Sequence, residues 1–94
     1  MARNYELHLG RYDIDTAISY LVRAGTGLFS ARKEEVNVQG VQTTQVYYGN
    51  QPCVHLFDVT KIEDGRIKVS VPLLTLWFFN GSTIQEVQDA LSGK

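Results

Sequence analysis

Two residues with reactive side chains stand two positions apart in the chain, Cys53 and His55. A thiol beside an imidazole is a nucleophile when the heavy atoms lie about 3 Å apart and a third group orients the imidazole. Alternate residues of a strand share a face, but their Cα atoms are about 6.5–7 Å apart. We therefore expect a buried thiol beside a half-exposed histidine. A small enzyme built on Cys53 and His55 is the third functional alternative.

A metal site would need His8 to lie beside Cys53 and His55, with Asp58 as a fourth ligand. The chain has neither the Cys-x-x-Cys nor the His-x-x-x-His spacing that brings metal ligands together locally. We therefore expect no metal, no cofactor and no assigned catalytic residue. The sequence favours a protein that is not an enzyme.

The composition is that of one small folded domain. The 94 residues are 44% hydrophobic and 20% charged, with a formal net charge of −1, which predicts a single domain over residues 1–94. The single cysteine excludes an intrachain disulfide, and residues 1–6 lack the apolar core of a secretory signal. The longest apolar stretch, 71–79, has about half of the roughly 20 residues that a membrane helix needs. We expect a cytoplasmic protein that does not contact a membrane.

Hydrophobic periodicity predicts the elements that must position these residues. Strand-like patterns of apolar, β-branched and aromatic residues occur at 5–9, 36–48, 53–60 and 67–71. An apolar stripe predicts a helix over about 13–24, ended by Gly25. Thr83 and Glu86 form a capping box at the start of a second helix, which Gly93 ends.

The apolar run 73–79 fits two structures. Its length and its aromatic residues favour a buried strand, whereas Pro72 also suits the first position of a helix; we favour the strand. The expected fold is an α+β two-layer sandwich of order β-α-β-β-β-(β)-α. It has a mainly antiparallel sheet of four to five strands with two helices on one face.

Two long stretches carry no charge, Val36–Phe57 and Val69–Gln85. Surfaces without charge invite association, and tyrosine and tryptophan are enriched at the cores of protein interfaces. We therefore expect a non-enzymatic interaction module that self-associates through its sheet, with a dimer favoured, and that engages a protein or small-ligand partner. The expected contact residues are Tyr47, Tyr48, Trp77, Phe78 and Phe79.

A nucleic-acid-binding regulator is the second functional alternative. It would use basic residues near the N-terminus to contact phosphates: Arg3, Arg11, Arg32 and Lys33. The segments Val69–Leu74 and Asn80–Val87 with Trp77 between them also resemble the helix-turn-helix half of small bacterial antitoxin-like proteins. That resemblance implies DNA binding by the second helix. Its outward residues are acidic or neutral where a DNA-reading helix is basic: Gln85, Glu86, Gln88 and Asp89.

Overall fold

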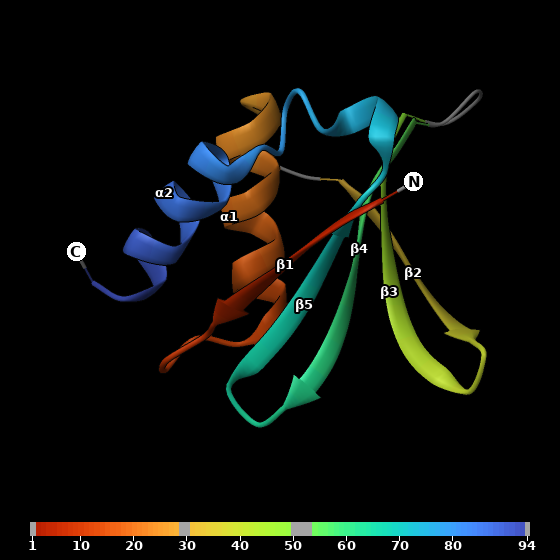
Figure 1. Cartoon of the computed structure of the whole chain (residues 1–94), viewed down its shortest axis with the longest axis horizontal. Helices are drawn as coiled ribbons and strands as arrows, with labels where there is room; N and C mark the ends of the chain where they lie inside the picture. The colour runs from red at the N-terminus through yellow and green to blue at the C-terminus, as the bar shows by residue number, and fades with distance from the viewer. Residues whose placement is uncertain (1, 29–30, 50–53, 94) are drawn as a thin grey trace.

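The computed structural model describes residues 2–28, 31–49 and 54–93, which form an antiparallel sheet with two α-helices on one face (Figure 1). The elements are β1 (Arg3–His8), α1 (Ile14–Thr26), β2 (Arg32–Val38), β3 (Val41–Tyr48), β4 (Val54–Glu63), β5 (Arg66–Val71), the short 3₁₀-helix η1 (Leu73–Thr75) and α2 (Gly81–Leu91). The strands are ordered β1-β5-β4-β3-β2, and all neighbours are antiparallel. The predicted fold class, an α+β sandwich with both helices on one face of the sheet, is confirmed.

The fifth strand is not the one that the sequence favours. Residues 73–79 contain η1 and turns rather than a strand, because this segment must cross from the sheet to the helical layer before α2 begins (Figure 1). The additional strand arises because the single strand expected at 36–48 is divided into β2 and β3 by a turn at Gln39 and Gly40, and β2 starts four charged residues earlier than predicted, at Arg32. β2 is an edge strand with mostly exposed side chains, so its first four residues carry no apolar alternation. The helix-turn-helix expectation is also wrong, since residues 69–71 belong to β5.

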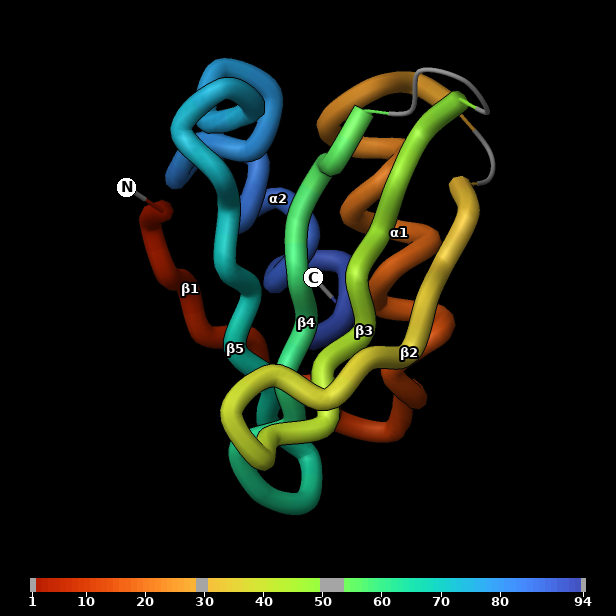
Figure 2. Tube along the Cα trace, turned by 90° about the vertical axis from the view of Figure 1, so that its right-hand side faces the viewer, coloured from red at the N-terminus to blue at the C-terminus, as the bar shows by residue number. Residues whose placement is uncertain are grey.

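The core lies between the helices and the sheet face that they cover (Figure 2). The helices contribute the buried residues Ala17, Ile18, Leu21, Val22, Ile84, Val87 and Leu91. The strands contribute the buried residues Leu7, Val46, Leu56, Phe57, Val59, Ile67, Val69 and Val71. The opposite, open face of the sheet carries polar and charged side chains, including the ion pairs Glu6–Arg66 and Arg32–Glu34.

Helix α1 runs further than its sequence pattern indicates. Asp13 caps its N-terminus by accepting a hydrogen bond from the Thr16 N–H at 2.8 Å, as expected for an N-cap aspartate. Its C-cap is Gly27, whose φ of 78° lies in the left-handed region, so the prediction that Gly25 ends the helix is wrong. Gly25 lies inside α1 because the Phe79 ring packs there: a Cβ at this position would lie 2.3 Å from the ring's Cε1.

A side chain of α2 closes part of the β1 edge. The Gln88 side-chain amide donates to the His8 carbonyl at 3.0 Å, and its oxygen accepts from the His8 N–H at 2.8 Å. These two bonds reproduce the pairing that a neighbouring strand would make. They tie the end of α2 to the sheet. Asn80, rather than Thr83, caps the start of α2, since its Oδ1 accepts from the Thr83 N–H at 3.0 Å.

Candidate interaction site

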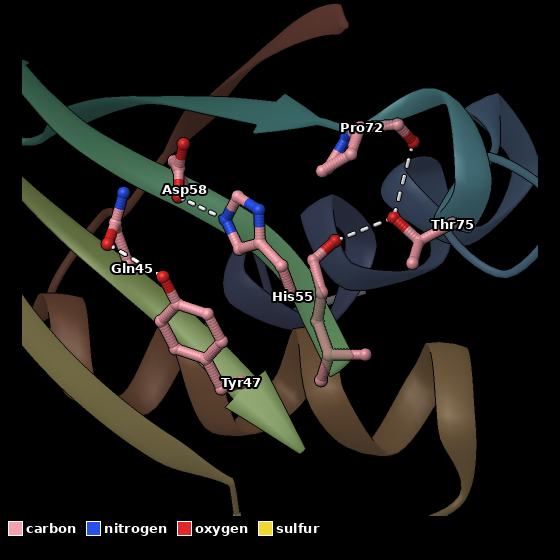
Figure 3. A network of polar contacts seen from close by, with 7 residues as sticks. Gln45, Tyr47, His55, Asp58, Pro72 and Thr75 are labelled. Atoms are coloured by element: carbon pink, nitrogen blue, oxygen red, sulfur yellow. Dashed lines mark hydrogen bonds and ion pairs between the residues drawn. The ribbon is translucent and has the colours of Figure 1, made fainter. Parts of the chain in front are cut away.

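The connection between β5 and α2 is held by two inward-pointing side chains. The Thr75 hydroxyl donates to the Leu56 carbonyl of β4 at 2.7 Å, and Thr75 is only 3% exposed (Figure 3). The Phe79 ring is fully buried and meets the Phe57 ring edge-on, with 5.0 Å between centroids. The connection is therefore fixed to the sheet at its start and to the core at its end.

Between and beside these two anchors, four large apolar side chains face outward. Leu74 is 92% exposed and Trp77 is 84% exposed, and Leu73 and Phe78 are also exposed. We call these four residues the apolar patch. Tyr48 and Val54 are exposed as well, and they lie at the same end of the sheet, where β3 ends and β4 begins. A cluster of this kind exceeds the singly scattered apolar residues of an ordinary protein surface.

Hydrogen bonds fix the backbone beneath the apolar patch. The Thr75 N–H donates to the Pro72 carbonyl, and the Phe79 N–H donates to the Thr75 carbonyl. Further along, the Asn80 side chain donates to the Trp77 carbonyl at 3.1 Å, and the Thr83 hydroxyl donates to the Phe78 carbonyl at 3.0 Å. The outward direction of the patch is thus set by the fold rather than by an unconstrained loop. A surface ordered in advance loses less conformational entropy when it binds.

The predicted contact residues fall into separate environments. Trp77 and Phe78 belong to the apolar patch, and Tyr48 is exposed at the same end of the sheet. Phe79 is fully buried, so its expected place on a contact surface is wrong. Tyr47 lies on the open face, partly covered by its neighbours, where its hydroxyl donates to Gln45 Oε1 at 2.8 Å (Figure 3).

The open face holds a histidine–aspartate pair beside Tyr47. His55 Nε2 lies 2.6 Å from Asp58 Oδ1 (Figure 3), although residues at i and i+3 of a regular strand point to opposite faces. A β-bulge explains the contact. The β3–β4 register passes from Val46↔Phe57 to Tyr47↔His55, so Leu56 is an extra residue in β4 that returns His55 to the side of Asp58.

The same cluster extends across three strands. The Tyr47 and His55 rings are tilted by 31° with their centroids 5.0 Å apart, and the Arg32 guanidinium lies 4.9 Å from the centroid of the Tyr47 ring. When His55 is neutral, Nε2–H donates to Asp58 and Nδ1 is left as the acceptor. Asp58 therefore orients the His55 imidazole, a contact that the sequence spacing alone did not reveal. Cys53 lies outside the described residues.

The other residues considered from the sequence do not assemble into a site. Among residues 2–28, 31–49 and 54–93, no group of three His, Cys, Asp or Glu side chains lies close enough to hold a metal ion. Of the four basic residues, Arg32 pairs with Glu34 on the open face and Lys33 pairs with Asp15 on the helical side. Arg3 begins β1, whereas Arg11 lies beyond its other end. No helix in the described part of the chain is long and apolar enough to cross a membrane.

Comparisons with known proteins return no relative: no family model, no curated protein and no solved structure matches this chain.

Proposed function

We propose that this chain is a non-enzymatic interaction module that self-associates through the apolar patch. The observation that carries the proposal is the exposure of Leu74 and Trp77, at 92% and 84%, on a backbone anchored by Thr75 and Phe79. Exposed leucine and tryptophan side chains lose unfavourable contact with water when a partner covers them. Tryptophan is also the residue type most enriched among those that dominate binding energy.

The absence of charge favours a second copy as the occupant of the apolar patch. In a two-fold dimer, the same surface of both protomers meets itself, so a charged patch would face its own charge. The uncharged stretch Val69–Gln85 contains the whole patch, and such a surface pairs with itself without repulsion. A standard interface buries about 800 Å² on each partner. The patch, extended by Tyr48 and Val54, supplies the apolar centre of such an interface.

Light scattering coupled to size-exclusion chromatography tests this proposal. We expect light scattering to give the wild-type protein twice the 10.6 kDa mass of one chain. The Leu74→Asp variant should have the mass of one chain and remain folded. Leu74 is almost fully exposed, so its replacement removes the contact without disturbing the core. A wild-type monomer at every concentration, or a Leu74→Asp dimer, would contradict the proposal.

The matched control is Ile62→Asp. Ile62 is also an exposed aliphatic residue, 46% exposed, but it lies on β4 near the turn to β5, at the opposite end of the sheet. The two variants introduce the same charge onto an exposed aliphatic position. We expect Ile62→Asp to remain a dimer, and a monomeric Ile62→Asp would show that added charge, rather than the apolar patch, controls assembly.

A second candidate function rests on the His55–Asp58 pair. An imidazole oriented by a carboxylate is the base that activates a nearby nucleophile, and Cys53 precedes His55 by two residues. If the pair serves Cys53, the thiol of the native protein reacts with iodoacetamide faster than the thiol of the unfolded chain, and Asp58→Asn slows the reaction. A native thiol that reacts more slowly than the unfolded one would exclude this candidate.

A further inference from the structure

A groove with an apolar floor lies between the start of α1 and the side of the sheet that the helices face. It has a volume of about 580 Å³, within the range of small-ligand sites. Leu9, Ile14 and Val59 supply apolar surface, and Thr44 lies among them. Figure 2 shows α1 running behind β3 and β2, and the groove opens beside the N-terminal end of this helix.

Carboxylates dominate the charged lining of this groove. Asp13, Asp15, Glu35 and Glu63 line it, and Lys61 is the single basic residue among the described residues of the lining. Asp15 is paired with Lys33, and Glu63 is paired with Arg66. Lys61 is itself paired with a carboxylate outside the groove, that of Asp64.

The other two carboxylates, those of Glu35 and Asp13, accept hydrogen bonds from uncharged groups. Glu35 Oε1 accepts from the Thr44 hydroxyl at 2.9 Å, and its Oε2 accepts from the Gln42 amide at 3.3 Å. Asp13 accepts from the Thr16 N–H, and this backbone hydrogen bond, before any other cause, lowers the pKa of Asp13 below its ordinary value. Both acids therefore bring negative charge to the groove while their bonds to protein donors fix their position.

We infer that this groove binds an aliphatic primary ammonium group, with Glu35 as its principal charged contact. The methylene chain lies against Leu9, Ile14 and Val59, and the ammonium donates to the Glu35 carboxylate at the rim. Such a ligand matches both parts of the lining, because it joins an apolar stem to a cation that makes strong hydrogen bonds to carboxylates. The ligand chemistry is that of a diamine or of a lysine side chain.

Two-dimensional NMR titration tests this inference. We expect 1,5-diaminopentane or Nα-acetyl-lysine methylamide to cause saturable shifts of the Ile14, Glu35 and Thr44 amide signals, and 1-pentanol to cause none that saturate. Saturation with the diamine alone would assign a free amine as the ligand, and saturation with the lysine derivative alone would assign a protein side chain. Equal binding of 1-pentanol, or no saturable shift with either amine, would overturn the inference.

A pair of variants on one strand separates this site from general electrostatic attraction. Glu35→Gln removes the charge of the proposed contact, and we expect it to weaken amine binding by about tenfold or more. Glu34→Gln makes the same change at the adjacent residue, which points to the open face and pairs with Arg32. Glu34→Gln should retain wild-type affinity, and equal losses in both folded variants would overturn the inference. The apolar patch plays no part in this titration, so it can be run in the Leu74→Asp background.

Discussion

The two uncharged stretches of the chain occupy different kinds of environment. The stretch Val36–Phe57 contains most of the β2–β3 hairpin, where Thr43, Thr44 and Val46 of β3 are buried. The stretch Val69–Gln85 contributes Val69, Val71 and Phe79 to the core, yet it also contains the four exposed residues of the apolar patch. The first stretch is largely accounted for by the chain's own sheet. The described part of the first stretch also leaves apolar side chains exposed, but none of them by more than half, whereas Leu74 and Trp77 of the second stretch are 92% and 84% exposed.

Two aromatic residues close together in the sequence also lie in different environments. Trp77 and Phe79 are two positions apart, but one is 84% exposed and the other is fully buried. Their hydrophobicity does not decide this difference. Phe79 is buried because Gly25 leaves room for its ring on α1, whereas Trp77 lies on the outward side of the anchored connection.

The largest expected effect comes from truncating Phe79, and Trp77 provides the comparison. Phe79→Ala should lower the free energy of unfolding by about 3–5 kcal/mol, because it leaves a cavity in the core. Trp77→Ala should change it by less than about 0.5 kcal/mol. Urea unfolding followed by circular dichroism measures both, in the Leu74→Asp background so that self-association does not contribute. Similar losses for the two variants would show that Trp77 also packs within the monomer.

The close packing of Phe79 against Gly25 can be tested by adding a methyl group at position 25. Gly25→Ala should destabilise the protein by about 1–3 kcal/mol, because the new methyl group overpacks against Phe79, although alanine alone favours a helix by up to about 1 kcal/mol. Gly81→Ala is the matched control, since Gly81 also lies in a helix and a Cβ there meets nothing within 4 Å. In thermal unfolding, the melting temperature of Gly25→Ala should lie below that of the wild type, and the melting temperature of Gly81→Ala should be equal to it or higher. A stabilised Gly25→Ala would contradict the packing described.

Removing the hydrogen bond of Thr75, the other anchor of the connection, should lower the free energy of unfolding by a smaller amount. Thr75→Val keeps the shape of the side chain but removes the hydrogen bond to the Leu56 carbonyl, and we expect a loss of about 1–2 kcal/mol. Thr60 is a half-exposed residue on the open face of the sheet, in β4. Thr60→Val should therefore lower the free energy of unfolding by less than Thr75→Val. Chemical denaturation measures both variants. Equal costs would mean that the buried hydroxyl of Thr75 adds nothing to the attachment of the connection.

A loss of stability smaller than that of Thr75→Val is expected in the first uncharged stretch. Tyr47→Phe removes the hydrogen bond from the Tyr47 hydroxyl to Gln45 but leaves a ring in contact with the His55 ring. We expect a loss of about 0.5–1 kcal/mol and an unchanged oligomeric mass. A monomeric Tyr47→Phe would move the self-association surface from the apolar patch to the open face of the sheet.

Periodicity in the sequence was sufficient to predict both helices, the β3–β4 hairpin and the layered arrangement. It merged residues 36–38 of β2 with β3 into one strand, and it missed the first half of β2, 32–35, because exposed charged residues of an edge strand have no apolar alternation. It could not separate Phe79 from Trp77, because that difference depends on Gly25, which is distant in the chain and next to Phe79 only in the fold. The His55–Asp58 contact was also missed, since it requires the bulge at Leu56, for which the residue types at 55–58 give no signal.

The bonds between Gln88 and His8 bear on how the sheet resists growth into a polymer. An unprotected edge strand is a template on which another chain can add, and at His8 that template is already occupied by an amide from the last helix. Strand addition along the whole length of β1 would first require α2 to release this residue. Release of Gln88 from His8 is therefore a step that full-length strand addition at β1 needs and that addition at the other edge strand, β2, does not.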